Sequence, residues 1–276
     1  MESSIICPIS QTAMSFAFSA KIFDKYDVNY YRCPECGILK TEHPFWLDEA
    51  YENAINDTDT GVVARNLTNS NILEYLIPCL RLENGKALDI AGGYGLLARM
   101  LRDKGFDCYT TDKYCQNLFA KSFEPEDAFK ANVLFAFEVL EHIEDPVSFL
   151  ADIFTRYSCK TLIFSTVTFT ENVPPKEWWY YSFEGGQHIT FYQKQTLKSL
   201  ADHFNLYYYS LDGITHMYTE SKLSYFQRAI IFNSYIHQKY AHHIKKARRG
   251  FSKTWEDHYK LKEQKCAKLK NRAQNI

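Results

Sequence analysis

Residues 86–113, KALDIAGGYGLLARMLRDKGFDCYTTDK, decide the fold of this chain. A short apolar strand runs into the glycine-rich turn 91–95, and apolar side chains at helical spacing follow. Gly105 ends this helix as C-terminal caps usually do, and a second strand then ends on Asp112. The expected bounds are 87–90 for the first strand, 96–104 for the helix and 108–111 for the second strand. The pattern predicts an α/β protein with a nucleotide-binding half-sheet.

The glycine-rich turn discriminates among nucleotide ligands. It contains no Lys-Ser or Lys-Thr pair, which argues against a triphosphate-binding P-loop. It also lacks the third glycine of the G-x-G-x-x-G dinucleotide motif, where Leu97 or Ala98 would have to serve. A carboxylate at the tip of the next strand, Asp112, can accept hydrogen bonds from both ribose hydroxyls. The sequence therefore favours a nucleoside-containing ligand of another kind.

An acid that opens the turn and an acid that closes the next strand resemble the class I S-adenosylmethionine-dependent methyltransferases. Their first motif reads acid-x-Gly-x-Gly-x-Gly, and Asp89, Gly93 and Gly95 match it. Ala91 stands at the first glycine of the motif, a small departure that should still let the backbone approach a ligand. The resemblance implies that Asp112 binds the ribose and that the turn passes under the methionine part of S-adenosylmethionine.

A second motif strengthens this resemblance. The apolar run 133–137 is typical of a buried strand, and EVLEHIEDP follows it from Glu138 to Pro146. Small-molecule methyltransferases carry a similar "EVLEHI-DP" signature after their fourth strand. The resemblance covers about residues 86–209 and implies a Rossmann-like sheet with helices on both faces. The cofactor-binding residues that it implies are Asp89, Ala91, Gly92, Gly93, Gly95, Asp112 and Glu138.

Periodicity predicts further elements on both sides of the two motifs. Helices are expected at 47–51, at 71–82, after Pro146 and at 195–203, and strands at 118–123, 161–166 and 206–211. The segment 174–181, PPKEWWYY, is rich in aromatic residues but polar and broken by prolines. We expect it to line a substrate cleft beyond the edge of the sheet rather than to enter the core.

His188 is the candidate catalytic residue. It lies on a loop that Gly185 and Gly186 precede, and similar bacterial methyltransferases carry such a segment on the substrate side. A neutral imidazole there could take the proton from an attacking hydroxyl. The alternative is that His188 only orients the loop through hydrogen bonds. His142 is a second candidate base, although its place just after Glu138 is more typical of a structural histidine.

Two cysteine knuckles near the start of the chain suggest a zinc ribbon, because each tight turn of this kind aims two thiolates at one ion. The first knuckle is incomplete, since Ser10 stands where its second thiolate should be. Cys7, Cys33 and Cys36 remain as metal ligands, with His43 as a candidate fourth. The segment resembles the zinc-binding segment ahead of some bacterial methyltransferase domains, including sugar-modifying ones. The alternative is a degenerate knuckle that keeps its turns without metal.

The end of the chain is basic. Residues 221–276 hold 14 Lys and Arg against 3 Asp and Glu, although the whole chain has a net charge of −1. Apolar residues recur there at helical spacing, at Phe232, Ile236, Tyr240 and Ile244. Such a helix can pack on the body, dimerise, or contact an acidic surface such as membrane phosphates or nucleic acid. We divide the chain into a zinc-ribbon-like segment (1–45), a methyltransferase domain (46–220) and a basic helical extension (221–276).

These observations predict direct methyl transfer from S-adenosylmethionine to a small molecule or glycan. One alternative is an RNA or protein methyltransferase that uses the basic tail, although the body is acidic and carries no recognised nucleic-acid motif. Another is a non-catalytic module that only binds the cofactor, which the intact turn residues argue against. The sequence does not determine the acceptor, the methylated atom or the oligomeric state.

We expect a cytoplasmic location. Residues 1–10 lack the basic start and apolar core of a signal peptide, and no run approaches the ~18 apolar residues of a membrane span. Eight unevenly spaced cysteines do not suggest a disulfide scaffold in a chain of 276 residues.

Overall fold

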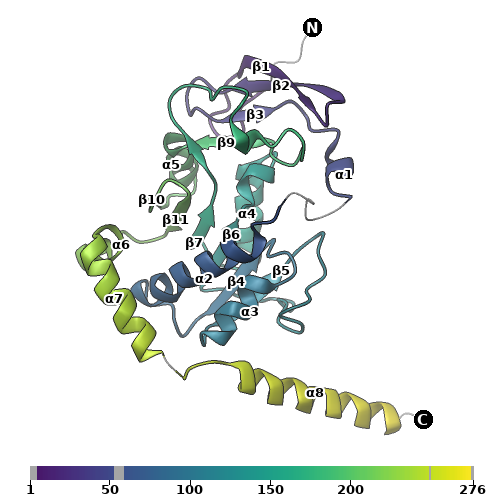
Figure 1. Ribbon diagram of the computed structural model, residues 1–276, viewed down its shortest axis with the longest axis vertical. Helices are drawn as coiled ribbons and strands as arrows, with labels where there is room; N and C mark the ends of the chain where they lie inside the picture. The colour runs from purple at the N-terminus through teal and green to yellow at the C-terminus, as the bar shows by residue number, and fades with distance from the viewer. Residues whose placement is uncertain (1–4, 53–58, 249, 275–276) are drawn as a thin grey trace.

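The computed structural model describes residues 5–52, 59–248 and 250–274. Its centre is a six-stranded sheet in the order β10-β11-β7-β6-β4-β5 (Figure 1). Strands β4, β5, β6 and β7 are parallel, and β11 and β10 add an antiparallel hairpin at one edge. The bounds are β4 Lys86–Ile90, β5 Asp107–Thr111, β6 Val133–Phe137, β7 Leu162–Ser165, β10 Tyr207–Ser210 and β11 Thr215–Thr219. This confirms the predicted α/β fold, whereas β11 was not predicted.

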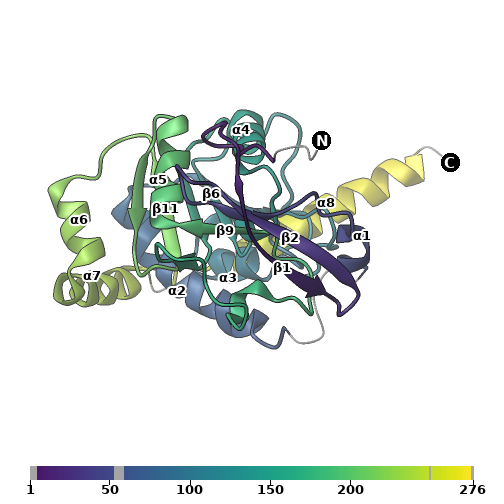
Figure 2. The same ribbon diagram turned by 90° about the horizontal axis from the view of Figure 1, so that it is seen from above.

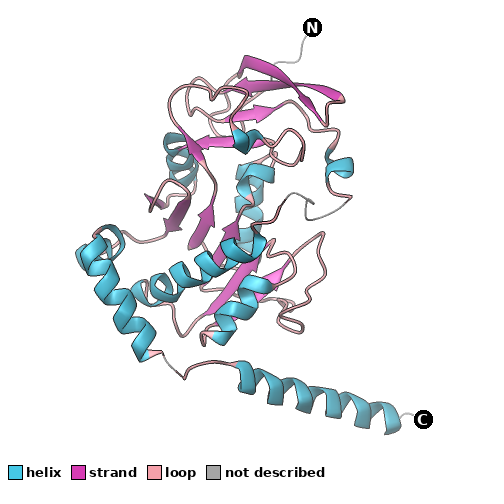
Figure 3. Cartoon of the chain, in the orientation of Figure 1, coloured by secondary structure: helices cyan, strands magenta, loops and turns pink. Residues whose placement is uncertain are grey.

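Helices cover both faces of this sheet, as parallel strands require (Figure 3). Helices α2 and α3 pack with Val133 and Phe135 on one face. Helices α4 and α5 pack with Leu134 and Phe164 on the other. Their bounds are α2 Val62–Cys79, α3 Leu96–Asp103, α4 Pro146–Arg156 and α5 Lys194–His203. Gly105 adopts φ 87° just after α3, which confirms the predicted cap.

A second sheet of five strands lies across the end of the first, in the order β1-β2-β3-β9-β8 (Figures 1 and 2). Strand β3 pairs antiparallel with β9, so the beginning of the chain shares a sheet with the segment that follows His188. The short helix α1, Leu47–Ala50, follows β3. The bounds are β1 Ser15–Ile22, β2 Tyr26–Arg32, β3 Leu39–Thr41, β8 Thr168–Phe169 and β9 Thr190–Gln193.

The strand expected at 118–123 is wrong, because these residues form turns and bends. Asn117 accepts the backbone N–H of Ala120 in a tight turn, and Ser122 adopts φ 71°. Leu118 and Phe119, which suggested a strand, are 46% and 53% exposed. The side-chain hydrogen bond of Asn117 and the positive φ of Ser122 favour turns over the strand that the apolar pattern predicted.

The expectation that segment 174–181 stays out of the core is wrong for its last two residues, whereas residues 175–177 are exposed as expected. Tyr180 and Tyr181 are fully buried and pack against Tyr30 and Phe191 under the second sheet. Their hydroxyls remain satisfied, since Tyr181 donates to the carbonyl of Pro174 and Tyr180 donates to a buried carboxylate. Buried tyrosine is stable when its hydroxyl finds a partner, which the sequence does not reveal.

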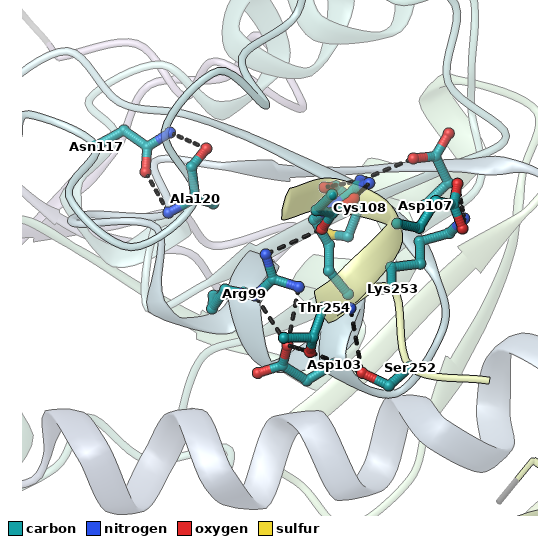
Figure 4. A network of polar contacts seen from close by, with 12 residues as sticks. Arg99, Asp103, Asp107, Cys108, Asn117, Ala120, Ser252, Lys253 and Thr254 are labelled. Carbon is teal, nitrogen blue, oxygen red and sulfur yellow. Dashed lines mark hydrogen bonds and ion pairs between the residues drawn. The ribbon is translucent and has the colours of Figure 1, made fainter. Parts of the chain in front are cut away.

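Three helices follow the two sheets: α6 Tyr225–Phe232, α7 Ser234–Ala247 and α8 Thr254–Gln274. Helix α7 packs on α2, where the rings of Tyr75 and His237 lie 4.2 Å apart. Among the described residues, helix α8 contacts the body near its start, and the helix then projects from the body (Figure 1). At this attachment Thr254 donates to Asp103, which also pairs with Arg99 (Figure 4). None of the described helices is both long enough and apolar enough to cross a bilayer.

Candidate active site

The predicted turn and the predicted acids meet at one edge of the large sheet. Ile90 is paired with Thr111, and Asp89 is paired with Phe135. The three strands therefore end together, and the turn 91–95, Asp112 and Glu138 follow them at the same edge. Ligands of parallel sheets bind at this carboxyl edge.

The glycine-rich turn needs left-handed backbone at three places. Ala91, Gly93 and Gly95 have φ values of 52°, 57° and 81°. At Gly93 an added Cβ would meet nothing within 4 Å, so the backbone there borders open space that a ligand can approach. At Gly92 an added Cβ would lie 2.3 Å from Asp89 Oδ2, so this position requires glycine for packing. Ala91 adopts a conformation that is strained for any residue with a Cβ.

Asp112 is held in place by three backbone N–H groups. Its Oδ2 accepts from Gly93 at 2.9 Å, and its Oδ1 accepts from Tyr114 and Cys115, each at 2.7 Å. The side chain is half-buried; its Oδ1 already accepts two hydrogen bonds, whereas its Oδ2 accepts one and keeps a second lone pair. Asp112 can therefore accept a ribose hydroxyl at Oδ2 without a change of rotamer.

The Asp89 carboxyl group is buried beside the turn. It is 3% exposed, and no described residue donates a hydrogen bond to its side chain. Burial, together with the charge of Asp112, raises the pKa of Asp89 to about 8. Two neighbouring carboxylates beside an open backbone favour a cationic ligand. S-adenosylmethionine carries both a sulfonium and an ammonium group, so the residues present fit this cofactor.

Glu138 follows β6 and turns the chain into the short 3-10 helix η1, Leu140–His142. It adopts φ 54°, and its N–H donates to Ser165 Oγ at 2.9 Å, while that hydroxyl donates back to the Glu138 carboxylate. This pair fixes the start of η1 against β7.

A second group of titratable side chains lies next to this edge: Glu141, His142 and His188. Their ligand atoms all lie within 4.8 Å of one another. The second sheet holds them together, because the N–H of Ile189 donates to the carbonyl of Glu141 at 2.8 Å. The hydroxyl of Thr190 also donates, to the carbonyl of Ile143, at 2.7 Å. The sequence predicted His188 and considered His142, but it did not predict Glu141, although Glu141 stands in the second motif.

Hydrogen bonds fix the tautomers of both histidines. His142 Nδ1 lies 3.1 Å from the carbonyl of Gln187, and His188 Nδ1 lies 2.7 Å from the carbonyl of Tyr180. A carbonyl only accepts, so each Nδ1 carries the proton and each Nε2 keeps a lone pair. Burial lowers the pKa of His142 to about 3 and also lowers the pKa of His188. Both rings are therefore neutral near pH 7.

Glu141 is completely buried. Its Oε1 accepts from the hydroxyl of Tyr180 at 2.7 Å, whereas its Oε2 is buried without a partner among the described residues. Burial, and then the charge of Glu138, raises the pKa of Glu141 well above its usual value. An oxygen left in this condition is costly, and such an atom commonly marks a functional site.

Tyr51 contacts both the loop after Asp112 and the histidine group. Its ring stacks on Tyr114 at 4.4 Å, and its hydroxyl lies 3.0 Å from His142 Nδ1. Arg65, at the start of α2, pairs with Asp59 at 2.6 Å, and the charges of nearby acids at the site also help to raise its pKa. The segments around α1 and the start of α2 thus cover the site.

The three cysteines lie together at the other end of the second sheet. Cys7, Cys33 and Cys36 are buried, and the sulfur atoms of Cys7 and Cys36 are 3.5 Å apart. Tetrahedral zinc with bonds of about 2.3 Å spaces its sulfurs by about 3.8 Å, so the cluster fits such an ion. Ser10 Oγ lies 3.2 Å from Cys33 Sγ, in the place of the missing thiolate. His43 as fourth ligand is wrong, because it is 80% exposed and contacts Glu144 instead.

Comparisons with known proteins agree with this geometry. A family model described as a methyltransferase domain matches residues 64–211, which is more than half of the chain. Among curated proteins no sequence matches significantly.

Solved structures that resemble this chain include three with bound S-adenosylhomocysteine (SAH). The first is CalO1, a methyltransferase in calicheamicin biosynthesis, with 16% identity, coverage of 54% of this chain and 53% of that one, and a TM-score of 0.37. The second is magnesium protoporphyrin IX methyltransferase from Synechocystis PCC 6803, with 13% identity, coverage of 62% and 90%, and a TM-score of 0.40. The third is the plantazolicin methyltransferase BpumL, with 12% identity, coverage of 70% and 82%, and a TM-score of 0.40. The chain thus spans about half the length of CalO1. Because these TM-scores lie below 0.5, the family assignment rests on the sequence model.

Proposed function

This chain belongs to the class I S-adenosylmethionine-dependent methyltransferases, and from this premise we propose that it methylates a hydroxyl group of a small molecule or glycan. The observation that carries the proposal is the meeting of two groups at one edge of the sheet. One group, around Asp89 and Asp112, suits a cationic nucleoside, and the other, around His188, offers a neutral imidazole nitrogen to an acceptor.

S-adenosylmethionine supplies an activated methyl group when it is bound. The chain's own residues then have to bind, align and exclude water. Asp112 orients the ribose, Asp89 faces the cationic end, and the turn 91–95 lets the backbone pass close by. Glu138 completes the cofactor edge as the first residue after β6. Tyr51 closes the site through its contacts with Tyr114 and His142.

His188 is the proposed catalytic residue. A hydroxyl has a pKa far above 7, so it must lose its proton or be polarised as the methyl group arrives. His188 Nδ1 is committed to the carbonyl of Tyr180, which leaves the Nε2 lone pair for this task. In the simplest form that lone pair takes the proton as a general base, and such catalysis contributes ~10²–10⁴ in rate.

The test combines a binding measurement with a transfer assay. Calorimetry should show that the wild type, His188→Ala and the surface control His203→Ala all bind SAH equally. With methyl-labelled S-adenosylmethionine and a panel of sugars and phenols, His188→Ala should lose ~10²–10⁴ in rate, and His203→Ala should lose none. A His188→Ala protein that keeps more than about a third of the wild-type rate would contradict the role. Absence of binding of either nucleoside by the wild type would overturn the whole proposal.

RNA or protein is the second candidate class of acceptor, and helix α8 favours it. This helix projects from the body (Figure 2). Its lysines Lys260, Lys262 and Lys265 are exposed. RNA binding that falls steeply with salt and disappears on removal of residues 258–276 would support it. The same helix could contact anionic membrane lipid, and vesicle binding with the same deletion tests that contact.

We further propose that Cys7, Cys33 and Cys36 hold a structural zinc ion, as the spacing of their sulfurs supports. Metal analysis should then show zinc that Cys33→Ser loses.

We keep 1–45, 46–220 and 221–276 as the proposed division of the chain. The described cysteines form no disulfide bond, and we keep the cytoplasmic location as a proposal.

A further inference from the structure

Three side chains with unused ligand atoms lie together beside the proposed cofactor edge. They are Glu141, whose Oε2 is buried without a partner among the described residues, and His142 and His188, whose Nδ1 atoms donate to carbonyls and leave each Nε2 unused. The two imidazole rings lie 4.9 Å apart at 87°, and one ligand atom from each of the three residues lies within 4.8 Å of the others. These residues come from η1 and from the loop before β9, which the backbone hydrogen bond from Ile189 to Glu141 joins.

A purely structural cluster would not leave these atoms in this state. Side-chain polar groups that fill a core are normally paired, and leaving one buried and unpaired is unfavourable. Tyr180 satisfies one carboxylate oxygen of Glu141, yet the other has no partner among the described residues, although the side chains of His142 and His188 lie close by. We propose that Glu141, His142 and His188 bind a divalent metal ion, which would satisfy all three atoms at once.

The ligand set indicates the class of metal. Two neutral imidazole nitrogens and one carboxylate oxygen suit zinc, manganese, cobalt or iron(II), whereas magnesium and calcium prefer oxygen ligands alone. The second contacts of the ligands are those typical of metal sites, since each histidine donates its other N–H to a carbonyl. Tyr180 likewise orients Glu141. Three protein ligands leave positions open, as in catalytic rather than structural sites.

The metal gives the proposed reaction a specific form, and this part of the inference rests on the proposed function. An acceptor hydroxyl that occupies an open position has its pKa lowered toward neutrality, as bound water does. Its proton leaves to solvent. The oxygen then forms a bond to the methyl carbon while the carbon–sulfur bond breaks, and that electron pair stays on sulfur as a neutral thioether. His188 would then act by holding the metal, because its one lone pair cannot both bind the metal and take the proton.

Cobalt binding tests the site without knowledge of the acceptor. The protein is stripped with a chelator and titrated with Co²⁺, which is followed by its visible absorption and by metal analysis. Cys33→Ser serves as the background, because the cysteine cluster gives thiolate-to-cobalt bands of its own. In that background we expect one tightly bound Co²⁺ per chain with weak visible bands typical of nitrogen and oxygen ligands.

Matched variants make the test specific. In the same background Glu141→Gln and His188→Gln should each weaken Co²⁺ binding at least tenfold, in line with loss of a metal ligand. His43→Gln should change nothing, because His43 is exposed and lies on Glu144. All variants should still bind SAH, which reports that the fold is intact.

The outcomes separate the two proposals. If the Cys33→Ser protein binds no Co²⁺ or Zn²⁺ stoichiometrically, or if Glu141→Gln binds as well as its parent, the metal site is overturned. His188 could then still serve as a general base. If the metal binds as expected but no nucleoside does, the proposed function fails while the metal site stands.

Discussion

Helix α8 begins at one buried ion pair, and the pair offers a sharp test of the structure. Asp257 is 3% exposed and accepts three hydrogen bonds from guanidinium groups. Arg102 donates two of them, at 2.6 and 2.8 Å, and Arg99 donates the third at 3.0 Å. Glu256 stands next to Asp257 in the sequence but is 67% exposed and pairs with Lys253 on the surface. Asp257 and Glu256 thus carry the same charge, but the first is buried and the second is exposed to solvent.

Asp257→Ala should therefore cost far more stability than Glu256→Ala. Removing one member of a buried ion pair costs about 3–5 kcal/mol, because the remaining charge stays buried. Arg102 keeps a second carboxylate, Asp107, at 2.7 Å, so we expect the lower end, about 3 kcal/mol. The exposed pair of Glu256 should contribute no more than about 0.5 kcal/mol.

Urea unfolding followed by far-ultraviolet circular dichroism measures both free energies. The double variant Arg102→Met with Asp257→Leu is the internal control, since apolar replacement of both partners removes the unpaired charge. It should be more stable than Asp257→Ala. A loss below about 1 kcal/mol for Asp257→Ala, or a loss equal to that of Glu256→Ala, would refute the reasoning and the attachment of α8 with it.

Three further predictions concern the cofactor edge. Ala91→Gly should raise the free energy of unfolding by about 0.5–1 kcal/mol, because the strain of alanine at φ 52° exceeds the entropy that glycine adds to the unfolded chain; a decrease in urea unfolding would contradict this. Asp112→Ala should weaken SAH binding by about 1–3 kcal/mol in calorimetry, whereas the exposed Asp152→Ala on α4 should not. Asp89, with its pKa of about 8, is mostly protonated near pH 7, and a cation beside it would lower that pKa. Binding of S-adenosylmethionine at pH 7 should therefore release close to one proton, and the affinity should rise between about pH 6 and 8. Calorimetry in two buffers of different ionisation heat measures the number of protons released. Equal proton release by the Asp89→Asn variant would count against this role of Asp89.

The geometry of the proposed cofactor edge could be predicted because its determinants are local. The turn 91–95 and the strand ends around it lie within one continuous stretch of sequence, and the residue types there match the backbone conformations that they adopt. Gly93 and Gly95 have positive φ, as the motif suggests, and Asp112 accepts the N–H of Gly93 across only 19 residues. Periodicity likewise predicted β4, α3, β6 and α4, since each buries an apolar run of its own.

The local sequence pattern gave wrong predictions where distant contacts or turn residues determined the structure. Segment 174–181 looked too polar for a core, yet Tyr180 and Tyr181 are buried because distant groups satisfy their hydroxyls. The apolar residues near 118–123 suggested a strand, but turn-forming Asn117 and Ser122 prevent it.

The sequence by itself thus determined the fold class and the place of the turn 91–95 between its strand and its helix, because contacts between near neighbours enforce them. Only the tertiary structure decided which distant side chains share an environment. Hydrogen bonds from Ile189 and Thr190 to the segment 141–143 bring His188 to Glu141 and His142, and no periodicity encodes that meeting. The ion pair between Arg102 and Asp257 joins residues 155 positions apart, while the adjacent Glu256 stays in solvent. Burial sets the energy of a charge, and burial is a property of the folded chain as a whole.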